Sequence, residues 1–308
     1  MRRFLIDTDT ASDDAVAILM ALRTPDVHVE GITIVAGNVP VEQGSKNALN
    51  TVELCNAQAP VYIGMHRPLV REPSWAYFFH GDDGMGGLHL PAPRRKPEGL
   101  HAVDAIINTV RSAPGEITLV TLGPLTNIAV ALRKAPEIAA EVREVFVMGG
   151  AANTVGNITP AAEYNIWVDP EAAHAVFHSG MPILMVGWEH CRGASMLTEE
   201  DMAYVRNFKT PYADYALGIN RRAIQTCLEW LGVKGLLLPD PVAMAVAIDR
   251  AVCTRSGRHY VDVEMASELT RGMTVVDELG VTNKEPNVEV CWAVDADRWK
   301  ETLYRTLC

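Results

Sequence analysis

The sequence lacks both the long apolar run of a membrane-spanning chain and the excess of positive charge of a nucleic-acid-binding one. No stretch of about eighteen uncharged apolar residues occurs, so no spanning helix is expected. Lys and Arg number 27 against 38 Asp and Glu, which gives a net charge of −11. A surface of this sign repels phosphate backbones and anionic membranes. We therefore expect no nucleic-acid polymer and no membrane as partner, whereas a neutral small molecule is not repelled.

Cysteine is sparse and a leader segment is not evident. The six cysteines are scattered without a CxxC pair, so we expect free thiols rather than disulfides or a zinc site. At the N-terminus two arginines precede only three apolar residues before Asp7, which is too few for the apolar region of a signal peptide. These features predict a cytoplasmic protein.

Short β-rich apolar runs alternate with helical patterns along a chain that is 48% hydrophobic. Strands are expected at Arg3–Asp7, Val29–Val35, Val61–Gly64, Ile117–Leu122, Glu144–Met148, Pro182–Val186, His259–Glu264, Met273–Val276 and Val288–Ala293. Helices are expected at Asp14–Arg23, Val41–Asn56, Val103–Ser112, Leu125–Lys134, Pro170–His178, Tyr212–Trp230 and Pro241–Arg250. The alternation predicts an α/β fold, an open and mainly parallel sheet flanked by helices, as one Rossmann-like domain over residues 1–308. The clustered last strands predict a small antiparallel C-terminal appendix.

Two segments are too long and too rich in turn residues to be simple connections. They run from Val70 to Leu100 and from Gly149 to Val168. Long loops inside a compact domain are usually functional. Because open parallel sheets bind ligands at the carboxyl ends of their strands, we expect both loops to line a site there.

The segment FLIDTDTASDDAVAI places four carboxylates within eight residues after the first expected strand. Asp7 and Asp9 are two apart on an extended segment, so they are expected to point the same way. Asp13 and Asp14 open an apolar helix, where either one alone is more often a cap than a ligand. Capping does not account for Asp7 and Asp9 as well. The whole cluster therefore favours a hard divalent cation with oxygen ligands, calcium or magnesium.

Six ordered segments resemble the inosine–uridine nucleoside hydrolase family over nearly the whole chain. They are DTDTASDDAVAI, AGN at 36–38, TLGPLTNIA at 121–129, VMGG at 147–150, GNITPAAEYNIWVDPEAA at 156–173 and PDPVA at 239–243. The resemblance implies a calcium-dependent enzyme that cleaves the N-glycosidic bond of ribonucleosides. It is further expected to be a homodimer or homotetramer.

The resemblance also implies roles for individual residues around the metal. Asp9 would be both a calcium ligand and the general base that takes the proton of the attacking water. Asp14, Asp240 and the main-chain carbonyl of Leu122 would be further ligands. For Asp240 an alternative stays open, since an Asp before Pro241 is also typical of an N-cap followed by proline at the first helical position.

Seven residues would bind the substrate by the same resemblance: Asp13, Asn38, His80, Met148, Asn157, Glu163 and Asn165. Amides and carboxylates suit sugar hydroxyls because they offer fixed donors and acceptors. They also stabilise the positive charge of an oxocarbenium-like transition state. Asn157 could instead be a turn former, and Met148 could be a core residue.

The leaving base lacks an obvious proton donor. Some relatives have a histidine directly before the aspartate that matches Asp240, where this chain has Pro239. The preference for purine or pyrimidine therefore cannot be carried over. Besides His80, the candidates to surround the base are Trp75, Tyr77, Trp188, His190, Tyr212, Tyr215, Arg222 and Trp230, of which most aromatic residues are ordinarily packing residues.

Two other functions fit parts of the pattern. A magnesium-dependent phosphatase of the haloacid-dehalogenase type also places DxD after its first strand, but it favours a Gly-Thr pair next, where this chain has Thr10 and Ala11. A non-catalytic, calcium-dependent nucleoside- or sugar-binding protein on the same scaffold would keep most of these residues, although it would not need Asp9 as a base.

Overall fold

Nine strands form one sheet in the computed structural model, which describes residues 1–308 apart from the side chain of Leu231. The strands are β1 (Arg2–Thr8), β2 (Val27–Ile34), β3 (Val61–Ile63), β4 (Ile117–Thr121), β5 (Glu144–Met148), β6 (Ile183–Val186), β7 (Cys253–Val263), β8 (Thr274–Asp277) and β9 (Val288–Val294). Their order is β3-β2-β1-β4-β5-β6-β9-β7-β8. In this order, the neighbouring strands are parallel from β3 through β1, β4, β5 and β6 to β9. β7 runs antiparallel to both of its neighbours, β9 and β8. The predicted α/β fold with an antiparallel C-terminal part is confirmed, and β9 joins that part to the main sheet.

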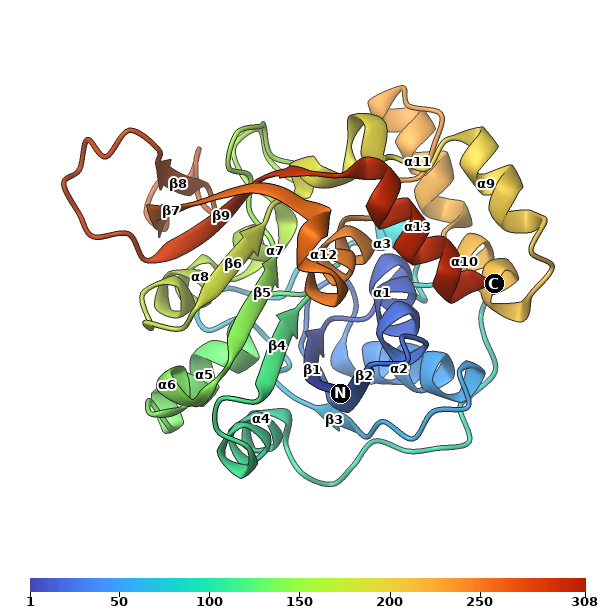
Figure 1. Cartoon of the computed structure of the whole chain (residues 1–308), viewed down its shortest axis with the longest axis horizontal. Helices are drawn as coiled ribbons and strands as arrows, with labels where there is room; N and C mark the ends of the chain where they lie inside the picture. Colours follow the sequence, from blue (N-terminus) through green and yellow to red (C-terminus); the bar gives the residue numbers. More distant parts are fainter.

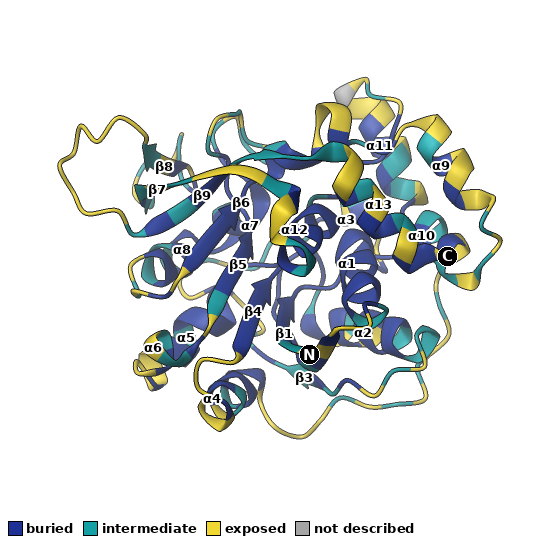
Figure 2. Cartoon of the chain, in the orientation of Figure 1, coloured by how far each residue is buried: buried dark blue, intermediate teal, exposed yellow. Residues whose placement is uncertain are grey.

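Helices cover both faces of the sheet (Figure 1). They are α1 (Ser12–Leu22), α2 (Val41–Leu54), α3 (Tyr77–His80), α4 (Ala102–Ser112), α5 (Thr126–Lys134), α6 (Ile138–Glu141), α7 (Tyr164–Val168), α8 (Pro170–Phe177), α9 (Glu199–Arg206), α10 (Pro211–Ile219), α11 (Arg221–Leu231), α12 (Pro239–Ile248) and α13 (Ala296–Leu307). One buried cluster joins α1, α2, α12 and α13 to the sheet, and a second joins α4, α5 and α8 to its other face. Figure 2 shows the strands between these layers as buried. No helix that the structure describes is both long enough and apolar enough to cross a membrane.

The chain reverses its direction of travel across the sheet at β1, and this reversal positions the site. β1 pairs with β2 on one side and with β4 on the other, both in parallel register. Connections from their carboxyl ends depart to opposite faces, which leaves a crevice at that edge. α1 begins there and is buried from Ser12 to Ala21 because its apolar residues surround the whole helix.

Several elements differ from the sequence-based expectation. The helix expected over Tyr212–Trp230 is two helices, α10 and α11, because the side chain of Asn220 donates to the carbonyls of Ala216 at 2.9 Å and Ser12 at 3.4 Å. The expectation of a single helix is therefore wrong. The two long loops are confirmed, but each contains a short helix, α3 in the first and α7 in the second. Helices α9 and α13 are additional to those expected.

Candidate active site

Four carboxylates meet where β1, α1 and α12 come together. Asp9 follows β1, and Asp13 and Asp14 lie in the first turn of α1. Asp240 lies in the first turn of α12, which packs against α1. Asp13, Asp14 and Asp240 each present an oxygen within 4.8 Å of the others, and the carboxyl group of Asp9 adjoins that of Asp14. All four side chains are buried.

Burial makes the negative charges of this cluster unfavourable. It raises the pKa of Asp13 to about 6, and burial together with the charge of Asp13 raises the pKa of Asp14 to about 6. Burial and the neighbouring carboxylates hold the pKa values of Asp9 and Asp240 well above their ordinary range. Among the described residues, Asp9 Oδ1 and Asp13 Oδ1 have no hydrogen-bond partner. An all-oxygen donor set with uncompensated buried charge fits a hard divalent cation.

The orientation of Asp9 is fixed by close backbone approaches. The N–H of Asn38 donates to Asp9 Oδ2. A Cβ atom at Gly37 would overlap Asp9 Oδ2, and one at Gly123 would lie 2.8 Å from Asp9 Oδ1. Only glycine therefore fits at these two positions, and the segments after β2 and β4 close tightly around this carboxylate.

Asp7 does not belong to the cluster. Its Oδ2 accepts hydrogen bonds from Thr33 Oγ1 at 2.6 Å and from Asn127 Nδ2 at 2.8 Å. β1 ends at Thr8, and Thr10 has a positive φ of 20°, so the chain turns instead of continuing as a strand. The expectation that Asp7 and Asp9 face one site is therefore wrong.

The capping interpretation applies to Asp14 but not to Asp240. Asp14 Oδ2 accepts the N–H of Ala11, the N-cap of α1, at 2.9 Å, so this residue caps the helix and also joins the cluster. In α12 the N-cap is Leu238, because the helix already begins at Pro239. Asp240 is thus the second helical residue, and the expected helix start at Pro241 with Asp240 in a preceding turn is wrong.

A cavity of about 240 Å³ opens beside the carboxylates. Nine of the eleven residues predicted for the site line it: Asp13, Asn38, His80, Leu122, Met148, Asn157, Glu163, Asn165 and Asp240. The other two, Asp9 and Asp14, adjoin the lining residues within the carboxylate cluster. Residues from six separate segments are thus gathered at the carboxyl edge of the sheet.

The loop after β5 supplies three polar side chains, which are partly engaged with the backbone. Asn157 Oδ1 accepts the N–H of Tyr164 at 2.9 Å. Asn165 Nδ2 donates to the carbonyl of Leu122 at 2.8 Å. Glu163 caps α7 by accepting the N–H groups of Asn165 and Ile166, and it also accepts that of Gly150 at 2.9 Å. Burial outweighs these N–H donors and raises the pKa of Glu163 to about 7.

His80 lies beside Asp13 at the end of α3. Its Nδ1 is 2.9 Å from Ser12 Oγ and 3.8 Å from Asp13 Oδ1. Burial lowers the pKa of His80 to about 4, although the charge of Asp14 acts in the opposite direction. The imidazole is therefore neutral at neutral pH.

The far end of the cavity is apolar and aromatic. Of the residues expected around the base, Trp188 and Trp230 join His80 in the lining. The others lie outside it: His190 contacts the carbonyl of Cys291, Tyr215 bonds Thr51, Tyr212 stacks with Arg23, Arg222 donates to the carbonyl of Phe78, and Trp75 stacks with Tyr77. These six candidates therefore do not line the cavity.

Sequence reasoning missed several lining residues. They are Ala76, Phe78, Phe79, Val155, Gly156, Ile158, Tyr164, Cys191, Arg192, Thr226 and Leu237. Phe78 stacks on Trp230 with ring centroids 5.0 Å apart and planes at 9°, which brings α3 against α11. Adjacency in sequence to a predicted site residue was an available signal for Phe79 beside His80, for Gly156 and Ile158 beside Asn157, and for Tyr164 beside Glu163.

Comparisons with known proteins agree with this geometry. The sequence family described as "Inosine-uridine preferring nucleoside hydrolase" matches residues 4–301. The chain is similar to the pyrimidine-specific ribonucleoside hydrolase RihB of Escherichia coli O157:H7, with 38% identity over 296 residues, 96% of this chain and 94% of that protein. Its structure is similar to the plant nucleoside hydrolase PpNRh1 (TM-score 0.94, 32% identity, 99% of this chain and 98% of that one). It is also similar to a purine-preferring ribonucleoside hydrolase from Gardnerella vaginalis (TM-score 0.92, 32% identity, the same coverage). The chain therefore belongs to the inosine–uridine preferring nucleoside hydrolase family and is an enzyme that hydrolyses the N-glycosidic bond of ribonucleosides.

Proposed function

We propose that this hydrolase is calcium-dependent and that Asp9 is its general base. The observation that carries the proposal is the group of four buried carboxylates beside a cavity at the reversal point of the sheet, of which Asp9 and Asp13 each have an unpartnered oxygen. Like charges at this density are unstable unless a cation or protons compensate them. Asp9 is held at its Oδ2 by one N–H donor, while its Oδ1 is free to accept a proton.

Asp9, Asp14, Asp240 and the main-chain carbonyl of Leu122 would hold the calcium ion. When bound, calcium supplies a positive charge that aligns the ribose 2′ and 3′ hydroxyls with the attacking water and makes that water more acidic. The Leu122 carbonyl already accepts from Asn165 Nδ2, but a carbonyl oxygen has a second lone pair. Asn165 would thereby position a ligand as well as contact the sugar.

The polar end of the cavity would bind the ribose. Asp13, Asn38, Asn157, Glu163 and Asn165 would contact its hydroxyl groups, and Met148 would lie against the ring. Glu163 Oε1 accepts only the N–H of Asn165, so it can accept a sugar hydroxyl as well. As the glycosidic bond lengthens and positive charge builds on the sugar ring, these oxygens stabilise that charge in a site shielded from water.

The aromatic end would hold the base, with His80 at the boundary between the two ends. Pro239 lines the cavity where a proton donor would be useful, and it has none to offer. Of the three hydrolases named above, RihB is pyrimidine-specific and the Gardnerella vaginalis enzyme is purine-preferring. We therefore assign this chain ribonucleosides as a class, and we expect a homodimer or homotetramer, which light scattering can test.

Release of reducing sugar tests the proposal directly. With calcium present, ribonucleosides should yield ribose, and a chelator should abolish the release. 2′-Deoxyribonucleosides should react much more slowly, because they lack one of the two hydroxyls that would be aligned. Equal rates with calcium and with chelator would contradict the calcium requirement. Equal rates for the two sugars would contradict the proposed alignment.

A further inference from the structure

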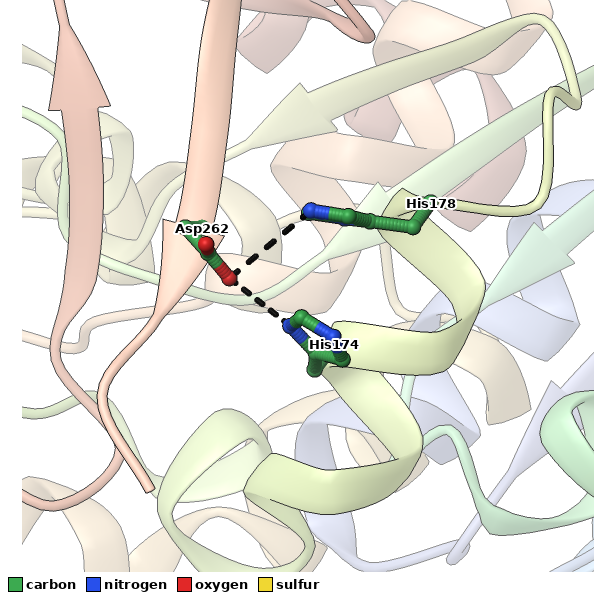
Figure 3. A group of neighbouring side chains, drawn as sticks. All are labelled: His174, His178 and Asp262. Atoms are coloured by element: carbon green, nitrogen blue, oxygen red, sulfur yellow. Dashed lines mark hydrogen bonds and ion pairs between the residues drawn. The ribbon is translucent and has the colours of Figure 1, made fainter. Parts of the chain in front are cut away.

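Two histidines and an aspartate form a second cluster, apart from the residues that line the cavity. His174 lies in the last turn of α8, His178 caps the end of that helix, and Asp262 lies on β7 (Figure 3). His174 Nδ1 is 2.7 Å and His178 Nε2 is 3.9 Å from Asp262 Oδ1. One atom of each residue lies within 4.8 Å of the others. The three side chains thus converge on one point between a helix and a strand.

Helix geometry accounts for the convergence. Residues four apart lie on the same face of a helix, one turn above each other. The imidazole rings of His174 and His178 have centroids 4.4 Å apart and planes at 32°. Their side chains are 37% and 30% exposed, and that of Asp262 is 30% exposed. An ion in solution can therefore reach all three.

The carboxylate of Asp262 is already oriented. Tyr260 Oη donates to Asp262 Oδ2 at 2.7 Å, and the N–H of Val263 donates to Oδ1 at 2.8 Å. Such second contacts commonly fix the ligands of protein metal sites. Lys284 Nζ lies 2.8 Å from Tyr260 Oη, which separates it from Asp262. Its positive charge therefore lies near the cluster and would weaken the binding of a cation.

The two histidines of this cluster differ in their hydrogen bonds. His174 has a short bond to Asp262, whereas His178 Nε2 is beyond hydrogen-bond range of that carboxylate and has only a 3.4 Å contact with Tyr260 Oη. The weakly bonded Nε2 of His178 is therefore available to a metal ion.

We propose that His174, His178 and Asp262 bind one zinc-class transition-metal ion, separate from the aspartate cluster. Two imidazole nitrogens and one carboxylate oxygen suit Zn²⁺, with water as a fourth ligand. The aspartate cluster offers oxygen only and favours hard cations, so the two sites select different metals. Zinc would tie β7 to α8. Its loss would leave nucleoside hydrolysis unchanged, because none of the three residues lines the cavity.

Calorimetric titration of Zn²⁺ into untagged protein in excess calcium tests the site. Wild-type protein should bind one Zn²⁺ that His178→Ala binds at least about a hundredfold more weakly, because loss of a ligand should exceed the roughly tenfold to hundredfold loss that follows removal of a hydrogen-bond partner of a ligand. His66→Ala is the matched control, since His66 is another exposed histidine beside a carboxylate, Glu42. Its isotherm should equal that of wild type. Asp262→Asn keeps the shape of the side chain but removes the anionic ligand, and it should also weaken binding.

The melting temperature provides a second measurement on the same variants. Zn²⁺ should raise it for wild type and His66→Ala but not for His178→Ala or Asp262→Asn. Zinc taken up by the aspartate cluster would contribute equally to all four proteins, so the difference between them isolates this site. If wild type shows no Zn²⁺ binding beyond that of His178→Ala, or the same thermal shift, the proposal is wrong. If either His178→Ala or Asp262→Asn fails to fold, the other variant provides the comparison with wild type.

Discussion

At the scale of single residues, the two carboxylate oxygens of Asp9 have different surroundings. Its Oδ2 is held by the N–H of Asn38, while its Oδ1 has no partner among the described residues. In Asp9→Asn the amide oxygen can keep the bond to Asn38. The variant should therefore fold, yet it cannot take a proton.

We predict that Asp9→Asn lowers kcat for ribonucleosides by a hundredfold or more, because the general base is lost and a calcium ligand is weakened. Reducing-sugar release measures kcat, and thermal unfolding checks the fold. The matched control is Asp82→Asn, which removes an exposed carboxylate two residues after His80 and should leave kcat unchanged. Near-normal turnover in a folded Asp9→Asn would refute the assignment of the base.

His80 and Pro239 are the two positions that bear on whether the departing base receives a proton. Pro239 cannot donate a proton, and burial lowers the pKa of His80 to about 4, so we expect no imidazolium to be available as a proton donor at neutral pH. We predict that p-nitrophenyl riboside, whose leaving group needs no proton, is cleaved at least about a hundredfold faster than inosine, the range that a missing general acid accounts for.

His80→Ala should then lower kcat/KM for both substrates by similar factors, because a neutral ring hydrogen-bonded to Ser12 positions the site rather than donating a proton. His89→Ala, at an exposed position of the same loop, is the control and should have no effect. A loss confined to inosine would instead identify His80 as the proton donor.

At the scale of secondary-structure elements, Asp201 joins α9 to α13. Its Oδ2 accepts from Thr198, the N-cap of α9, and from Lys300 Nζ at 2.8 Å, and its Oδ1 accepts from Tyr304 Oη at 2.8 Å. Burial alone would raise the pKa of Asp201, but these donors outweigh it and lower the pKa to about 2.

We predict that Asp201→Asn lowers the free energy of unfolding at pH 7 by about 1 kcal/mol after allowance for solvent screening. Because the pKa is lower in the folded state, the contribution is present above the unfolded value near 4 and is lost as pH falls towards 2. Urea unfolding at pH 7 and pH 3 measures the change. Glu200→Gln, an exposed carboxylate of the same helix, is the control. A difference between Asp201→Asn and wild type that does not shrink at pH 3 would contradict the linkage.

Elements formed by local patterns were predictable, whereas those set by distant contacts were not. Asp295 is the N-cap of α13 and accepts the N–H groups of Asp297 and Arg298. An aspartate at this position is a local signal for a helix start, so α13 could have been predicted from the sequence. The break between α10 and α11 depends on Asn220 reaching Ser12, over two hundred positions away in the sequence. No periodicity within the segment Tyr212–Trp230 could have indicated it.

At the scale of the whole molecule, the sheet order explains why the polar end of the cavity was predictable and the aromatic end was not. Asp9, Asn38, Leu122 and Met148 follow or end four neighbouring parallel strands, so strand prediction alone places them at one edge. Phe78 and Trp230 meet through packing of α3 against α11. That contact depends on the course of two long connections, which sequence patterns do not specify.

The same architecture links metal binding to global stability. Asp9 and Asp14 come from the β1–α1 turn, and Asp240 comes from α12, which packs on α1. In the absence of calcium these carboxylates repel one another, as their raised pKa values indicate. A cation between them binds only the folded chain, because unfolding separates its ligands.

We therefore predict that calcium at a hundredfold excess over its Kd stabilises the wild type by about 2.7 kcal/mol, a rise of several degrees in Tm, and that a chelator reverses the rise. Asp240→Asn should give opposite results in the two conditions. With calcium it should melt below wild type, because a ligand is lost. With chelator it should melt at or above wild type, because one of the crowded buried charges is gone. Scanning calorimetry of both proteins in both conditions, with Asp82→Asn as control, measures these differences in melting temperature. If Asp240→Asn melts below wild type by the same margin in both conditions, Asp240 supports the fold through packing and does not hold the metal.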